Sequence, residues 1–407
     1  MLTTINQIKD KLLVIVFLLY ILSSYVCQES LLPSTINSLF LMAFVGLSVI
    51  YAIRNPYAID EHFSRWYFVL LLYSLCSALL MNENVFQTWY QMLVVLILTF
   101  CLCVAIKSKE ALDSMVFVYV LAAVCMGILI VSYNPQYLID NIEDLDGVRL
   151  GGDETGNANI FSALMMFSGV FASWSALYKR NITIQVFSIL SLVFILYLMA
   201  LSGGRKTIIA LVVCMMFFIW KKGGHSGKKK FITIVAICSA LYLLVYLVIN
   251  VPWLYDVVGN RFEGLFSFIT GNGGDQVSSD STRKKMIDIG LKGWTQRPIF
   301  GHGLDSFKFF NKITTGHMYY SHNNYVEMLY DFGLIGFLFY YVFIYKLYKK
   351  LLSLPEEYKI YSILGIGILI ELLMFDLGGV SYYMNGNMIL LCIVSLIAYS
   401  SSLFKKQ

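Results

Sequence analysis

The residues best suited to chemistry in this sequence are cations placed outside long apolar segments. Arg205 follows the run 202–204 (SGG), where one apolar segment ends and the next begins. A guanidinium fits two phosphate oxygens at once, and the first turn of the next helix offers free N–H groups to an anion. An arginine at mid-membrane depth costs ~2.5–3.5 kcal/mol on insertion scales, so a function is expected for it. We therefore predict that Arg205 and Lys206 bind phosphate; extension of Arg205 to the outer lipid headgroups is the alternative.

A second set of polar residues runs directly into the apolar segment that begins near Asn324. His322 stands at the mouth of this helix, and an imidazole can remove a proton from a sugar hydroxyl near neutral pH. The other histidines are His62, His225, His302 and His317. Of these, His62 and His225 are expected on the cytoplasmic side. We predict that His322 is a general base, with Glu327 a weaker candidate to orient it; a structural histidine is the alternative.

Two further arginines accompany polar helix starts. Arg149 precedes Asn157 and Asn159 at the start of the segment 158–178, and Arg283 begins an amphipathic stretch. Arg149 is a candidate second phosphate contact, and Asn159 a candidate sugar contact or helix cap. A solvated loop arginine with ordinary asparagine capping is the alternative. The irregular spacing of the acidic residues of 143–154 favours solvated loop charges, and a divalent-cation site is the alternative.

The elements that must position these residues are membrane spans. Hydrophobic types make up 58% of the 407 residues and charged types 14%, which excludes an ordinary soluble domain. The apolar runs approach the ~20 residues needed to cross a bilayer. They are expected at 11–27, 36–53, 66–82, 86–106, 112–133, 158–178, 183–202, 206–220, 231–252, 324–348, 359–377 and 385–404. The sequence therefore predicts an all-α polytopic membrane protein with about 12 spans.

Lysines and arginines flank every second connection, which marks those connections as cytoplasmic and places both termini inside. The residues 1–407 are expected to form a single membrane domain. Two long connections, 134–157 and 251–323, are then external, and the second lies between the ninth and tenth spans. Apolar residues at helical spacing predict an amphipathic helix near 281–297 on the outer surface, capped by Asp280 or Ser281. The eight cysteines are interpreted as free, buried thiols, and no nucleic-acid motif is present.

The combined motifs resemble the O-antigen ligase/polymerase superfamily. They are P-x-x-G-x-G-x-x-x-F at 298–307, H-N-x-Y at 322–325, G-x-x-G at 333–336, S-G-G-R at 202–205 and R-x-G…N-x-N at 149–159. The pattern covers about residues 145–340 and is specific as a set. Members often carry Ser or Thr where this chain has Gly203 and Gly204, which leaves the placement of Arg205 open. His302 lies at a position that usually varies, so its role is unassigned.

The resemblance implies a GT-C-like membrane glycosyltransferase that uses an undecaprenyl-pyrophosphate-linked glycan donor and a glycan acceptor. It implies that His322 is the catalytic histidine and that Arg205 and Arg283 bind phosphate, with Arg149 less secure. Lys206, Asn159, Asn323, Tyr325, Gly301 and Gly303 are the further expected substrate contacts. Inverting transfer without metal or cofactor, at the outer face of the cytoplasmic membrane, is expected.

Three functions stay open from the sequence. A polymerase of capsule, O-antigen or exopolysaccharide repeat units is preferred, because polymerases of the family include such divergent sequences rich in Tyr and Phe. A ligase that transfers the glycan to lipid A core would use the same residues. A glycan-lipid flippase or other transporter is disfavoured, because the charges gather at one face. The sequence leaves open whether a chain-length regulator binds.

Overall fold

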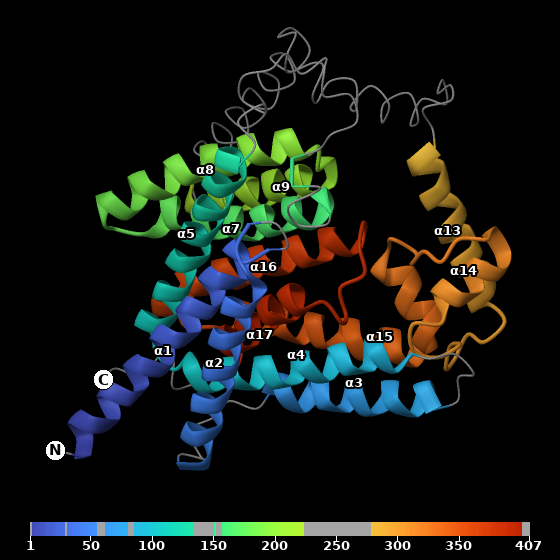
Figure 1. Cartoon of the computed structure of the whole chain (residues 1–407), viewed down its shortest axis with the longest axis horizontal. Coiled ribbons are helices and arrows are strands. Elements are labelled where there is room, and N and C mark those ends of the chain that lie inside the picture. The colour runs from blue at the N-terminus through green and yellow to red at the C-terminus, as the bar shows by residue number, and fades with distance from the viewer. Residues whose placement is uncertain are drawn as a thin grey trace, which may run out of the picture. The chain divides into compact units, whose positions relative to one another are not determined.

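The computed structural model describes residues 2–28, 31–54, 62–79, 85–133, 150–151, 157–223 and 278–400. Within these residues every regular element is a helix (Figure 1). The helices are α1 (Leu2–Val26), α2 (Ser34–Arg54), α3 (His62–Leu79), α4 (Phe86–Ala105), α5 (Lys109–Tyr133), α7 (Ala158–Tyr178), α8 (Ile182–Ser202), α9 (Arg205–Lys222), α13 (Ser278–Trp294), α14 (Phe307–Thr315), α15 (Asn324–Leu352), the 3-10 turn η5 (Glu356–Tyr358), α16 (Lys359–Asp376) and α17 (Asn385–Tyr399).

The helices confirm the predicted fold class. Among the described residues, 7 helices are long and apolar enough to cross a bilayer, and Lys11–Val26 and Asn385–Tyr399 are shorter apolar helices. Each predicted span that falls within the described residues coincides with a helix. The span expected at 231–252 lies outside them. The chain is thus an all-α, multi-pass membrane protein, and the total of about 12 spans stays a prediction.

Two compact units make up the chain: residues 1–44 with 110–274, and residues 45–109 with 275–407. In the first unit α7 packs against both α8 and α9 (Figure 1). The Ser168 hydroxyl of α7 donates to the Tyr119 carbonyl of α5 at 2.9 Å and lies 3.0 Å from the Tyr25 hydroxyl of α1. These bonds tie α1 and α5 to α7. The expectation of one membrane domain over 1–407 stays a prediction.

The second unit is built around α15, α16 and α17, with α17 packed on α16 and α4. Trp66 of α3 stacks on Phe343 of α15, with ring centroids 4.0 Å apart. All described cysteines are free thiols, but Cys76 is exposed, which corrects the expectation that all are buried. Cys76 shares an outward face of α3 with Phe68 and Leu72, which are also exposed; Cys238 lies outside the described residues.

A kink in α15 joins this helix to the loop 298–303. Gly333 has φ 63° and ψ −166°, which interrupts the helix. The freed N–H groups of Leu334 and Ile335 donate to the carbonyls of residues 298 and 299, at 2.8 and 3.2 Å. In return the loop amides of residues 302 and 303 each donate to an α15 carbonyl at 2.8 Å. Main-chain groups left without helical partners are therefore paired across the two segments.

Glycines are required where these two main chains meet. A Cβ on Gly301 would lie 2.4 Å from the Asp331 carbonyl oxygen, and a Cβ on Gly333 would lie 2.4 Å from the Ile299 carbonyl oxygen. Both glycines also have positive φ. The Tyr73 hydroxyl of α3 donates to the carbonyls of Phe300 and Phe332, at 3.3 and 3.1 Å. The P-x-x-G-x-G and G-x-x-G motifs thus form a joint, made of residues 298–303 and 330–335.

Candidate active site

The predicted site residues fall into two groups, one in each compact unit. Arg205, Lys206 and Asn159 belong to the first unit. The second unit holds Arg283, Gly301, Gly303, His322, Asn323 and Tyr325. Arg149 lies outside the described residues, as does the acidic cluster of 143–154. Each group is built by its own local contacts.

In the first unit, the S-G-G-R segment is a tight turn between α8 and α9. Gly203 ends α8 in the left-handed conformation, with φ 67°. Arg205 is the first residue of α9, and Lys206 is exposed. A hydrogen bond of 2.5 Å joins the Thr207 hydroxyl to the Ser162 hydroxyl of α7. The first turns of α7 and α9 therefore lie side by side.

The start of α7 completes this group. The Asn157 side chain caps the helix by accepting from the Asn159 amide at 2.8 Å. Asn157 is thus the cap, and the Asn159 side chain is exposed. Helix N-termini carry partial positive charge and free N–H groups. Two such termini, with Arg205 and Lys206 at one of them, make this end of the first unit suited to an anion.

In the second unit, the segment before α15 is held in a tight conformation. His322 has φ 56°, which is uncommon for a residue other than glycine. The Ser321 amide before it donates to the buried Glu327 carboxylate at 2.7 Å. The Asn323 side chain caps α15 by accepting from the Val326 amide at 3.1 Å. Glu327 therefore fixes the main chain beside His322, and its role in orienting the imidazole stays a prediction.

The next two residues anchor the start of α15 to α16. Asn324 accepts from the Ser381 amide at 2.9 Å and donates to the Asp376 carboxylate at 3.3 Å. The Tyr325 hydroxyl donates to the Leu373 carbonyl at 3.0 Å. In this structure the Tyr325 hydroxyl therefore stabilises the packing of α15 on α16, whereas the Asn323 side chain caps α15. The substrate contacts of both residues stay predictions.

Arg283 and His322 are brought together at Tyr320. Tyr320 lies two residues before His322, and the centroids of the two rings are 4.1 Å apart. Burial raises the pKa of Tyr320, and the nearby positive charge of Arg283 opposes that increase. Arg283 lies in the second turn of α13 and is partly buried. Arg283 and His322 thus both lie near Tyr320, a residue that the sequence pattern did not single out.

Helix α13 is the amphipathic helix that the sequence predicted, and it positions Arg283. It begins at Ser278, so Asp280 and Ser281 lie inside its first turn and not at the cap that was expected. Met286 on its apolar face is 4% exposed and packs against Phe307 and Tyr330. This part of the apolar face therefore contacts protein, because α14 and α15 cover it.

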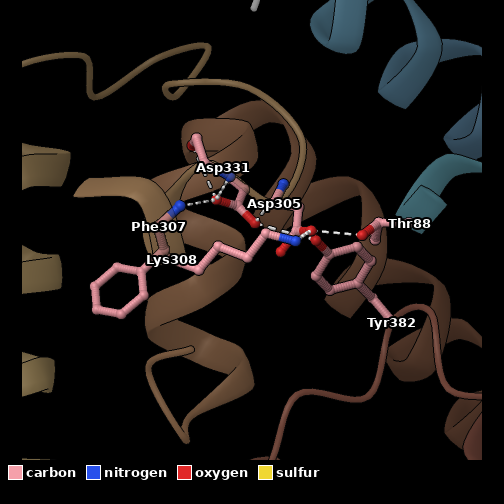
Figure 2. A network of polar contacts seen from close by, with 7 residues as sticks. Thr88, Asp305, Phe307, Lys308, Asp331 and Tyr382 are labelled. Atoms are coloured by element: carbon pink, nitrogen blue, oxygen red, sulfur yellow. Dashed lines mark hydrogen bonds and ion pairs between the residues drawn. The ribbon is translucent and has the colours of Figure 1, made fainter. Parts of the chain in front are cut away.

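Asp331 organises the turn that starts α14 (Figure 2). Its buried carboxylate accepts from the amides of Asp305, Ser306 and Phe307, each at 3.1 Å. It also accepts from the Ser306 hydroxyl at 3.1 Å and from the Tyr382 hydroxyl at 3.0 Å. Asp305 in turn accepts from Thr88 of α4 at 2.5 Å and pairs with Lys308. Asp331 therefore serves as the N-terminal cap of α14 from another helix.

His302 has a defined place at the end of α13. Its Nε2 lies 2.8 Å from the Gly293 carbonyl oxygen and its ring stacks on Tyr330, with centroids 4.4 Å apart. A carbonyl can only accept, so Nε2 carries the proton. Partial burial lowers the pKa of His302, which favours the neutral ring at pH 7. These contacts connect α13 to α15, away from the proton chemistry expected of His322.

One family model matches the part of the chain that contains Arg205, Arg283 and His322. Residues 190–341 match the family model described as O-antigen ligase. The matched segment is therefore similar to the O-antigen ligase family, in agreement with the motifs in the sequence. The match runs from within α8 to within α15, so Arg205, Arg283 and His322 all fall in the O-antigen ligase segment, whereas Asn159 precedes it. A search among curated proteins found no match.

Proposed function

We propose that this protein polymerises undecaprenyl-pyrophosphate-linked oligosaccharide repeat units into capsule, O-antigen or exopolysaccharide. The grouping of Arg283, Tyr320 and His322 within the O-antigen ligase segment carries this proposal. A guanidinium beside an imidazole supplies a diphosphate contact and a proton acceptor in one place. The proposed location is the outer face of the cytoplasmic membrane.

The proposed reaction is a single displacement with inversion. The acceptor hydroxyl oxygen forms a bond to the anomeric carbon of the donor, and His322 takes the hydroxyl proton. The bond between that carbon and the diphosphate oxygen breaks, which releases undecaprenyl pyrophosphate. Arg283 stabilises the charge that grows on the diphosphate, and Arg205 with Lys206 is the other proposed phosphate-binding group. No metal or cofactor is proposed, because the donor is already activated by its lipid diphosphate.

A ligase that transfers the glycan to lipid A core is the second candidate. The description of the matched family model names an O-antigen ligase, which favours this acceptor. The residues proposed for the displacement would serve equally, since only the acceptor differs. The acceptor therefore has to be determined by product analysis.

The test uses the purified protein in liposomes with a lipid-linked repeat unit. Undecaprenyl pyrophosphate release with a glycan ladder supports the polymerase, and transfer only to lipid A core supports the ligase. Translocation without a new glycosidic bond would overturn both and indicate a transporter. His322→Ala should abolish transfer, whereas His317→Ala, at an exposed position of the same loop, should leave it intact. Full activity of His322→Ala would remove the proposed base.

A further inference from the structure

The environment of Tyr320 differs sharply from that of the residues before it. Residues 316–319 are exposed, whereas Tyr320 is partly buried and Ser321 is fully buried. The chain therefore turns inward at Tyr320. Its ring lies 4.1 Å from the ring of His322, at an interplanar angle of 45°.

Both flanks of Tyr320 are fixed by buried side chains. Asn311 of α14 is fully buried, and its amide donates to the carbonyls of His317 and Tyr319, at 3.0 and 3.2 Å. On the other side, the Ser321 amide donates to Glu327 at 2.7 Å. The main chain on both sides of Tyr320 is thus held, from α14 and from α15, in the position that brings its ring to His322.

We propose that Tyr320 is the positioning residue for His322, and that its ring, rather than its hydroxyl, sets the orientation of the imidazole. A histidine side chain that is partly exposed has two free torsions, and packing against a fixed ring restricts both. A displacement of about 1 Å at a reacting group can cost about 100-fold in rate. This inference rests on the proposed function, because it assigns a role in the same proton transfer.

The ring of Tyr320 makes the observed contact with His322. Among the described residues, no hydrogen bond of the Tyr320 hydroxyl is present, whereas the ring contact with His322 is close. The charge of Arg283 acts on the phenol from nearby. A phenylalanine would keep the ring and its packing.

The experiment compares Tyr320→Phe and Tyr320→Leu in the liposome transfer assay. The phenylalanine variant should keep kcat within about threefold of the natural chain, because the ring remains. The leucine variant should lose about 10-fold to 100-fold in kcat with little change in KM, because the base is disordered while the donor still binds. Tyr319→Leu, at the exposed neighbouring position, is the matched control and should behave like the natural chain.

Two results would overturn the positioning role. They are normal kcat in Tyr320→Leu, or an equal loss in Tyr320→Phe and Tyr320→Leu, which would assign the effect to the hydroxyl. Thermal unfolding of each variant checks the fold, and Tyr320→Met replaces the leucine variant should that one unfold. The proposed function is refuted by other results: the natural chain makes no product, or His322→Ala remains active. Normal Tyr320→Leu beside an inactive His322→Ala overturns only the positioning role.

Discussion

Replacing Asp331 with asparagine should destabilise the second unit by about 2–4 kcal/mol. The asparagine oxygen can take the place of Oδ1 and keep the bonds from the Ser306 amide, the Ser306 hydroxyl and the Phe307 amide. The new NH₂ group then faces the Asp305 amide and the Tyr382 hydroxyl, which both donate in the natural chain. The hydroxyl can rotate and accept, but the Asp305 amide is left buried without an acceptor.

The magnitude follows from those bonds. An orphaned buried N–H group costs about 1–3 kcal/mol, and the remaining bonds weaken because they lose a charged acceptor. Thermal and denaturant unfolding of the purified protein in detergent would measure the change. Asp288→Asn on the exposed face of α13 is the matched control and should change stability by less than about 0.5 kcal/mol. An Asp331→Asn variant as stable as that control would refute the cap role of this carboxylate.

Three further predictions concern the charged groups. Glu327→Gln should keep transfer near the natural rate, because an amide oxygen still accepts from the Ser321 amide. Glu327→Leu removes that acceptor and should lower the free energy of unfolding by about 1–3 kcal/mol. Equal effects of the two variants on stability and transfer would contradict this role of Glu327. Arg205→Lys should lower kcat/KM by at least about tenfold, since an ammonium cannot make the two parallel bonds of a guanidinium. A lysine variant with full activity would show that charge alone suffices. Added chelator should leave the transfer rate unchanged. A marked loss of transfer activity would indicate a metal site at the acidic residues of 143–154.

Much of the fold could be predicted because hydrophobicity is a local property of the chain. Runs of apolar residues gave the helices from α1 to α9 and from α15 to α17 within the described residues. The helical spacing around Met286 likewise predicted α13, although the helix begins earlier, at Ser278. Asparagine capping at the start of 158–178 was one of two open interpretations, because asparagine before an apolar run is a local signal, and Asn157 is the cap.

The contacts that build the site were harder to predict, because they pair residues far apart in sequence. Asp331 lies nine residues after His322 in the sequence, yet its carboxylate binds the turn at 305–307. No local sequence pattern predicts that Asp331 binds the turn at 305–307. Tyr320 also went unnoticed, since tyrosines are common in this chain; its place two residues before His322 was the only available signal.

The joint between residues 298–303 and 330–335 allows the sequence of the loop 298–303 to vary without loss of its attachment to α15. The hydrogen bonds that link its two segments join main-chain atoms, and side chains are excluded from the contact at Gly301 and Gly333. Ile299 and Phe300 are exposed and can therefore be exchanged. One scaffold can in this way present many different surfaces to its surroundings.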